Sequence, residues 1–177
     1  MSRDFPDVLD PWKAADGRRS FQGTIPLKRM ARLITLLGSD EGEARFKVSF
    51  VYDRQKNLLI KLSVDADLTL ICQRSMQPYL EPVSRRSVLM VIRDLAQQDK
   101  VGGDYEPLLL ENGRLELVNV VEDELLLGVP QVPRNPAVKE VYWSTDGQVV
   151  AEPGERKERL QRPFAGLAGL LKNDVKE

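Results

Sequence analysis

The chain of 177 residues contains no histidine and a single cysteine, Cys72. Without histidine, neither a Ser-His-Asp triad nor a Cys-His pair can form, and no imidazole can hold zinc. One cysteine cannot form an internal disulfide, which is typical of proteins of the reducing cytoplasm. These absences exclude the commonest hydrolytic and zinc-dependent active sites.

Long apolar runs and phosphate-binding loops are also missing. No run approaches the roughly 18 apolar residues that span a bilayer, and the acidic start "MSRDFPDVLDPW" lacks the apolar core of a secretory signal. Neither G-x-x-x-x-G-K-[ST] nor G-x-G-x-x-G occurs. We therefore expect a cytoplasmic protein with no membrane partner.

Charge is nearly balanced overall but unevenly distributed. The net charge of −1 and pI of 5.7 argue against strong, sequence-independent binding to naked nucleic acid, and no feature indicates a DNA partner. Residues 1–36 carry seven basic and four acidic groups, whereas residues 104–127 carry seven acidic groups and only Arg114. This asymmetry indicates either two solvated faces or a polarised surface that suits an anionic partner.

Hydrophobic periodicity predicts a sheet with few helices. "SFQGTIPL", "ARFKVSFVY", "LLIKLSVDADLTLICQ" and "EPVSRRSVLMVIR" read as strands, and the third of these alternates apolar with polar residues, as a half-exposed antiparallel strand does. Helical spacing appears in "PLKRMARLITLLG", which Gly38 ends, and in "RLELVNVVEDELLLGVP". The fold class is therefore α+β, a mainly antiparallel twisted β-sheet with two or three helices and a flexible C-terminal tail.

The chain divides into three predicted parts. Residues 1–130 form a single α+β domain, and residues 131–161, which are rich in proline and charge, form a flexible linker. Residues 162–172 place Phe164, Leu167 and Leu171 on one face of a short docking helix. So short a helix is marginal in water, so it must dock on its own domain or on a partner.

Two features invite a chemical interpretation, and neither supports one. Glu122, Asp123 and Glu124 lie about 100° apart on a helix, so they cannot converge on one ion, and we expect them to face solvent or a partner. Cys72 lacks thiolate or imidazole companions and is expected to be a buried thiol at a strand end. Catalysis would need carboxylates from distant segments, such as Asp65, Asp67 and Glu122.

Several segments taken together resemble a known family. They are "LDPWKAADGRRSFQGTIPL", "VDADLTLICQRSMQPY", "YEPLLLENGRLELVNVVEDELLLGVPQVP" and the terminal "RPFAGLAGLL", in this order. The chain looks like the bacterial YceD family over roughly residues 8–133 and 162–172. The resemblance implies a role in accumulation of large-subunit ribosomal RNA and supplies no catalytic activity.

The resemblance also bears on the lone cysteine. Many family members have C-x-x-C where this chain has Cys72-Gln-Arg-Ser75, and they often carry a further His and Cys after the segment that here reads "VPRNPAVKEVYW". Those four residues could hold structural zinc. Only Cys72 remains of the set, so the resemblance implies that this chain has lost the metal.

We therefore predict a non-catalytic factor in ribosome biogenesis, without metal or cofactor, that supports synthesis, processing or stability of 23S ribosomal RNA. Its expected partners are pre-ribosomal large-subunit RNA, a large-subunit ribosomal protein, or both. The alternative is a protein-binding adaptor that acts on the RNA through a processing enzyme or a translation regulator. Candidate RNA-binding residues are Lys13, Arg18, Arg19, Lys28, Arg29, Arg32, Arg85 and Arg86. Candidate protein-binding residues are Glu122, Asp123, Glu124, Phe164, Leu167 and Leu171.

Overall fold

The computed structural model describes residues 5–103, 105–110, 112–138, 142–143 and 149–150. The chain divides into two compact units, Met1–Val138 and Lys139–Glu177. The first unit extends beyond residue 130, and two hydrogen bonds hold Pro133 and Asn135 against the turn that contains Cys72 and Gln73.

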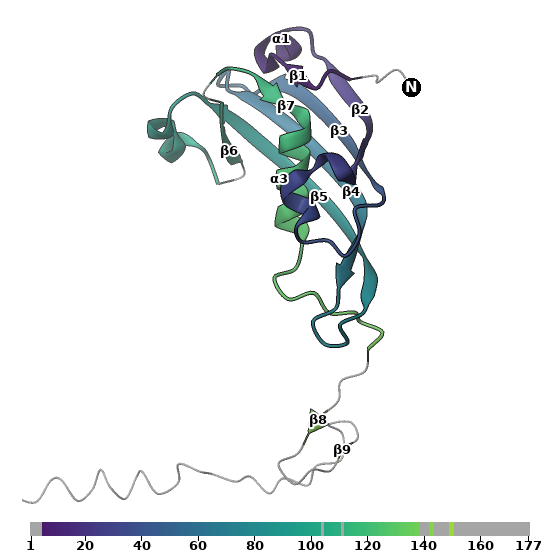
Figure 1. Ribbon diagram of the computed structural model, residues 1–177. Coiled ribbons are helices and arrows are strands. Elements are labelled where there is room, and N and C mark those ends of the chain that lie inside the picture. Colours follow the sequence, from purple (N-terminus) through teal and green to yellow (C-terminus); the bar gives the residue numbers. More distant parts are fainter. Residues whose placement is uncertain (1–4, 104, 111, 139–141, 144–148, 151–177) are drawn as a thin grey trace, which may run out of the picture. The chain divides into compact units, whose positions relative to one another are not determined.

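A five-stranded sheet forms the centre of the first unit (Figure 1). Its order is β2 (Ser20–Pro26), β3 (Glu43–Tyr52), β4 (Leu58–Ile71), β5 (Pro78–Ile92) and β6 (Glu106–Leu109). The first four strands are antiparallel neighbours, as predicted, but β6 pairs with β5 in parallel, so the sheet is mixed. A parallel pair needs a long crossover. Residues 93–105, with the 3-10 turn η2 (Leu95–Lys100), provide it.

Alternation along the strands separates an inner face from an outer face. In β3, Ala44, Phe46, Val48 and Phe50 are buried, and the residues between them are exposed or half-buried. In β4, every second residue from Leu58 to Leu70 is buried. This period of two confirms the predicted half-exposed sheet.

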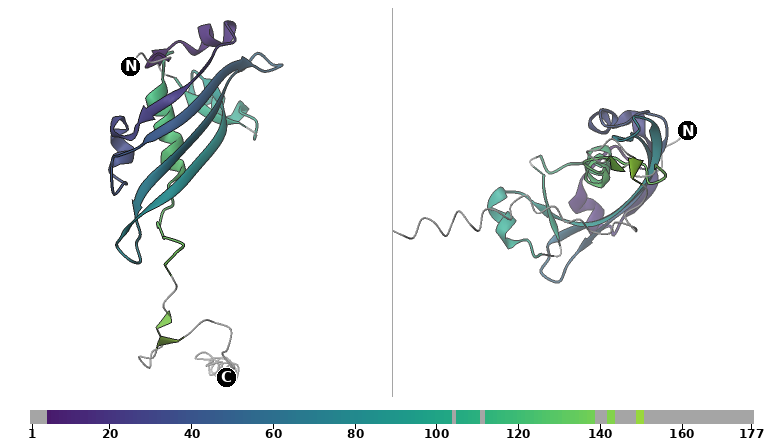
Figure 2. Two further views of the ribbon diagram at one scale, coloured as in Figure 1. Left: turned by 90° about the vertical axis from the view of Figure 1, so that its right-hand side faces the viewer. Right: turned by 90° about the horizontal axis from the view of Figure 1, so that it is seen from below.

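Three helices accompany the sheet within the described residues: α1 (Pro11–Asp16), α2 (Ala31–Ile34) and α3 (Leu117–Gly128). In α1, Pro11 occupies the first turn and the Asp10 carboxylate accepts hydrogen bonds from the amides of Trp12 and Lys13, an N-cap. Figure 2 shows the sheet curving around α3, which lies against its inner face. The helix predicted from "RLELVNVVEDELLLGVP" is confirmed.

The single long helix predicted from "PLKRMARLITLLG" is wrong. The segment forms a 3-10 turn, η1 (Leu27–Arg29), and then the four-residue α2, because Met30 between them adopts non-helical backbone angles. Leu27, Met30 and Leu33 are nevertheless all fully buried. The helical spacing therefore identified a segment that buries apolar side chains, but its backbone is not one regular helix.

A second, smaller sheet joins the N-terminal segment to the residues just before α3. Strand β1 (Val8–Leu9) pairs antiparallel with β7 (Leu115–Glu116), directly before α3. Phe5, preceding β1, packs edge-on against Phe46 of the main sheet with ring centroids 4.8 Å apart. The N-terminal residues therefore contribute to the core and do not merely cover the surface.

In the second unit the described residues form one strand pair, β8 (Tyr142–Trp143) with β9 (Val149–Val150). This pair falls within the predicted linker. The predicted docking helix over residues 162–172 lies outside the described residues. No helix in the described part of the chain is long and apolar enough to cross a membrane.

Candidate functional site

Five of the eight predicted RNA-binding residues form ion pairs within the chain. Their partners are Asp10 for Lys13, Asp7 for Arg29, Glu122 and Asp123 for Arg32, Glu124 for Arg85, and Asp65 for Arg86. The pair of Lys13 is long, at 3.7 Å, and its side chain is 85% exposed. Arg29, Arg32 and Arg85 are more firmly engaged, and their positive charge is partly neutralised before any partner arrives.

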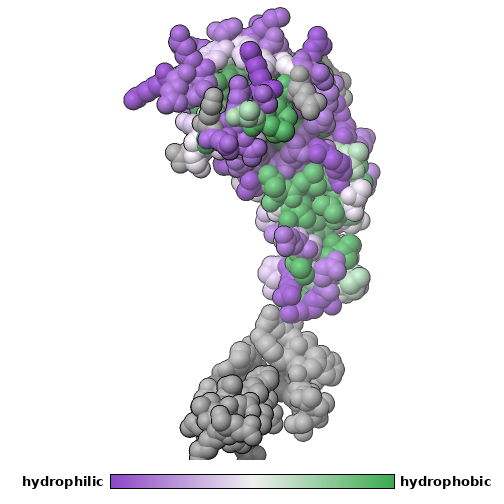
Figure 3. Space-filling view, turned by 90° about the vertical axis from the view of Figure 1, so that its left-hand side faces the viewer, coloured by the Kyte–Doolittle hydropathy of each residue, from purple (hydrophilic) through white to green (hydrophobic). Residues whose placement is uncertain are grey.

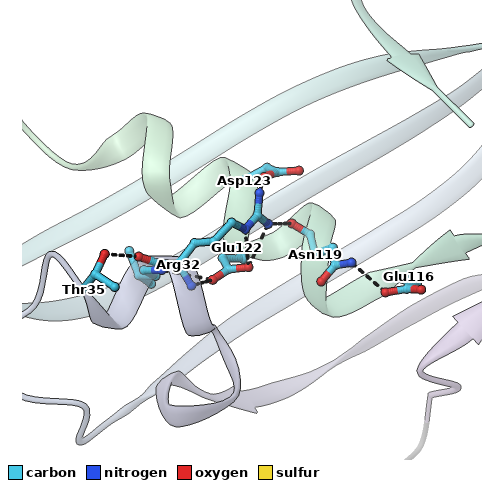
Figure 4. Close-up of polar contacts among 7 residues, drawn as sticks. Arg32, Thr35, Glu116, Asn119, Glu122 and Asp123 are labelled. Atoms are coloured by element: carbon cyan, nitrogen blue, oxygen red, sulfur yellow. Dashed lines mark hydrogen bonds and ion pairs between the residues drawn. The ribbon is translucent and has the colours of Figure 1, made fainter.

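Arg32 of α2 is bound to the acidic side of α3 (Figure 4). Its Nη2 lies 2.7 Å from Glu122 Oε2, its Nε 2.9 Å from the same oxygen, and its Nη1 2.6 Å from Asp123 Oδ1. The guanidinium therefore bridges two carboxylates that stand next to each other on one helix. Planar, multiple contacts of this kind are the strongest form of ion pair.

The Glu122 carboxylate also caps α2. Its Oε1 accepts hydrogen bonds from the amides of Arg32, at 2.7 Å, and Leu33, at 3.0 Å. The first amides of a helix have no partner within it, and Met30 at the N-cap supplies no side-chain acceptor. A residue 90 positions away in sequence thus provides the cap.

The pKa of Glu122 reflects this environment. Burial alone would raise it, but hydrogen bonds from the Leu33 amide and from the Arg32 side chain and amide outweigh burial, and the pKa is lowered. Contacts with Glu122 and Asp123 raise the pKa of Arg32. Both groups are therefore charged at neutral pH.

Glu124 points to the other side of α3. Its carboxylate, 3% exposed, lies 3.3 Å from the Nε of Arg85 on β5. The expectation that the acidic triplet faces solvent or a partner is therefore not met by Glu122 and Glu124, because Glu122 is buried against α2 and Glu124 against β5. Asp123, whose side chain is 51% exposed, retains an open side.

Arg85 and Arg86 occupy opposite faces of β5. Arg85 faces Val64 in the register and turns toward α3, whereas Arg86 faces Ser63 on the outer side. There Arg86 binds Asp65 at 3.2 Å, and hydrogen bonds from Ser84 and Arg86 lower the pKa of Asp65. The two residues cannot act as one binding element.

Arg18, Arg19 and Lys28 are exposed. Among the described residues, no carboxylate lies within ion-pair distance of these three. Arg18 and Arg19 border a hollow of about 370 Å³ that Ser49 and Tyr52 also line, at the end of the sheet where α1 lies. Within the described part of the chain, Arg18, Arg19 and Lys28 are the members of the predicted RNA-binding set whose charge no ion pair neutralises.

Sequence reasoning missed three exposed cations of the sheet: Arg45, Lys47 and Lys61. They share the outer face with Arg86. The signal that could have identified them was the alternation already noted in "LLIKLSVDADLTLICQ", which places Lys61 on the polar face. Without the strand order, Lys47 and Lys61 could not be assigned to neighbouring positions.

Cys72 is buried and free. The amide of Asn135 donates to its Sγ at 3.3 Å, and the amide of Gln73 donates to the carbonyl of Pro133 at 2.8 Å. The Ser75 side chain and the Asn135 amide lower the pKa of Cys72 to about 6. These contacts attach the turn between β4 and β5 to the segment that follows α3.

The zinc set implied by the family resemblance does not fit this turn. Opposite Cys72 Sγ stands an amide N–H, which donates a hydrogen bond and cannot bind a metal. No group of three or more His, Cys, Asp and Glu side chains placed to hold a metal ion occurs among the described residues. Within the described part of the chain, Cys72 therefore lacks the further ligands that a tetrahedral zinc site needs.

The carboxylates considered for catalysis lie apart. Asp65 and Asp67 alternate on β4 with buried residues and belong to the outer face, while Glu122 lies on α3 at the inner face. Asp65 and Glu122 are each engaged by an arginine. Phe164, Leu167 and Leu171, the remaining protein-binding candidates, lie outside the described residues.

Comparison with known proteins identifies relatives. Residues 60–171 match the family described as large ribosomal RNA subunit accumulation protein YceD. A protein of Haemophilus influenzae with this name is 31% identical over 166 residues, which cover 93% of the present chain and 95% of that relative. No solved structure matches.

Proposed function

Because the chain belongs to the YceD family, we propose that it acts in the accumulation of large-subunit ribosomal RNA. The observation that carries this proposal is the similarity to the Haemophilus influenzae protein, which extends over nearly the full length of both chains. The role concerns the synthesis, processing or stability of 23S ribosomal RNA in the cytoplasm.

The proposed mode of action is binding without catalysis. The carboxylates that would be needed for acid–base chemistry are dispersed over two faces, and two of them are held by arginines. Pre-ribosomal RNA, a large-subunit ribosomal protein, or both are the proposed partners. Arg18, Arg19 and Lys28 support the RNA partner, because phosphates attract cations that are not already paired.

The test is sedimentation of a bacterial lysate that contains the full chain, with and without ribonuclease. We expect the protein to travel with immature large subunits and to be released by ribonuclease. The Arg18→Glu, Arg19→Glu variant should sediment with them less than the wild type does. A matched variant, Arg114→Glu with Arg134→Glu, reverses two other exposed cations and should behave as wild type. Free protein at the top of every gradient would contradict stable ribosome binding.

The adaptor function remains a second candidate because apolar side chains are exposed at the end of α3 and on β5 with its preceding turn. Leu127 at the end of this helix is 65% exposed, and Val132, which follows it, is 53% exposed. Leu80 and Met76, on β5 and the turn before it, are 67% and 65% exposed. Figure 3 shows apolar surface on one face of the molecule. Exposed apolar surface favours a protein partner.

A further inference from the structure

The outer face of the sheet gathers three cations on three neighbouring strands. In the strand register, Lys47 of β3 faces Ser63 of β4, which faces Arg86 of β5. In the adjacent row, Ser49 of β3 faces Lys61 of β4. Directly opposed residues have Cβ atoms about 5 Å apart. Lys47, Lys61 and Arg86 are exposed, and their strands bury the opposite side chains under α3.

These side chains surround a shallow hollow of about 320 Å³. Its lining includes Lys47, Ser49, Lys61, Ser63, Arg86 and Val88, and it contains neither a carboxylate nor an aromatic ring. No carboxylate among the described residues forms an ion pair with Lys47 or Lys61. Lys47 and Lys61 therefore give the hollow positive charge that no described carboxylate compensates, together with hydroxyl groups, whereas Arg86 is already paired with Asp65.

The acidic groups of the outer face lie to one side of the hollow. Asp65, in the next row, is occupied by Arg86 and Ser84 and lies opposite Arg45. Glu43 and Asp67 stand farther along the strands, toward their other ends. Toward α1, Ser49 lines both this hollow and the one bordered by Arg18 and Arg19. Positive charge thus extends from the middle of the sheet toward α1.

Lysine, arginine and serine are the side chains that contact phosphate oxygens in nucleic-acid complexes. Aromatic side chains, on which unpaired bases stack, are absent from the lining. A protein partner would need apolar contact area, and the lining offers little beyond Val88 and Leu62. The chemistry therefore favours a sugar–phosphate backbone over an acidic protein.

We propose that the outer face of β3, β4 and β5 is a binding surface for the backbone of RNA, in which Lys47, Lys61 and Arg86 contact phosphates and Ser49 and Ser63 donate hydrogen bonds. This inference rests on the proposed function and specifies the surface that carries it. Contacts limited to the backbone make the binding independent of base sequence and sensitive to salt.

The test measures binding of the full chain to fluorescein-labelled oligouridylate by fluorescence polarisation at several KCl concentrations. Replacing both lysines, Lys47→Gln with Lys61→Gln, should weaken binding about tenfold at low salt. It should also reduce the slope of log K against log[KCl] by roughly 1.4, because each single-strand phosphate contact contributes about 0.7. The matched control, Arg114→Gln with Arg134→Gln, removes the same charge elsewhere and should change affinity less than twofold.

Equal affinity of the two double variants, or no binding by the wild type, would overturn the surface assignment. Equal binding of polyglutamate and RNA would also overturn it, in favour of an acidic protein partner. Circular dichroism of each variant shows whether its fold is intact. Sedimentation tests the proposed function separately. If the wild-type protein travels with large subunits but the lysine variant binds RNA normally, the proposed function stands. The outer face of the sheet is then not the surface that carries it.

Discussion

At the scale of single residues, Glu122 combines three tasks. It accepts two amide hydrogen bonds at the start of α2, pairs with Arg32, and joins α2 to α3. We expect Glu122→Gln to lower the free energy of unfolding by about 2 kcal/mol, because hydrogen bonds to a buried charged group contribute about 1.5 to 3 kcal/mol. Urea unfolding of the purified protein measures this change.

The neighbouring Asp123 supplies the control for that experiment. It binds the same guanidinium, but its side chain is half exposed. Asp123→Asn should therefore cost less than about 1 kcal/mol, as exposed ion pairs do. Equal losses from the two substitutions would show that the cap on α2 contributes little.

Glu122 also makes stability depend on pH. Its folded-state pKa lies below the ordinary value of 4.5, so the unfolded chain takes up the proton more readily. The stabilisation is complete above about pH 4.5 and is lost as the pH falls through the lowered pKa. Unfolding free energies measured from pH 6 to pH 3 should fall less steeply in Glu122→Gln than in the wild type. If the unfolding free energies of the two proteins fell with pH at the same rate, Glu122 would not be the source of this pH dependence.

Cys72 gives a prediction about metal. One sulfur without further ligands near it among the described residues cannot form a tetrahedral zinc site. Protein purified from zinc-supplemented cells should therefore contain far less than one zinc per chain by atomic absorption, and a chelator should leave its thermal midpoint unchanged. Stoichiometric zinc would show that ligands outside the described residues complete a site.

At the scale of elements, the contact between α3 and β5 depends on Gly128. A Cβ added there would overlap Val83 Cγ1, and it would also meet Arg85 Cγ at 3.5 Å. Gly128→Ala should lower the unfolding free energy by about 1 to 2 kcal/mol, because overpacking a tight contact outweighs the better helix propensity of alanine. Thermal unfolding measures the loss. Gly103→Ala, where nothing lies within 4 Å of the added Cβ, should change stability by less than about 0.5 kcal/mol.

The elements also show what a sequence can and cannot predict. The period of two in β4 and the helical spacing in α3 identified both elements, because each buries one face against the same core. The break at Met30 and the parallel pairing of β6 were missed, since both depend on distant partners, Glu122 and β5. For the same reason, the sequence did not predict that Arg32 binds Glu122. Arg32 was assigned to an RNA partner and Glu122 to a protein partner.

At the scale of the whole molecule, the unit Met1–Val138 has its own core and its own closing contacts. A chain ending at Val138 should therefore unfold cooperatively, with a thermal midpoint within a few degrees of the full chain. It keeps Leu80 and Leu127 but lacks Phe164, Leu167 and Leu171, so under the adaptor function it should capture a protein partner more weakly than the full chain does. Calorimetry tests the cooperative unfolding of the shortened chain, and a non-cooperative transition would contradict it. Affinity capture tests the weakened partner binding.

The pairing of β1 with β7 sets an order of events during synthesis. Strands β2 to β5 are antiparallel neighbours in chain order, so their contacts are comparatively local and can form early. Residues Val8 and Leu9, although made first, have no strand to pair with until Leu115 and Glu116 have been made. Strand β1 therefore stays unpaired through most of translation. We expect its pairing with β7 to be the last and slowest step in the folding of the first unit.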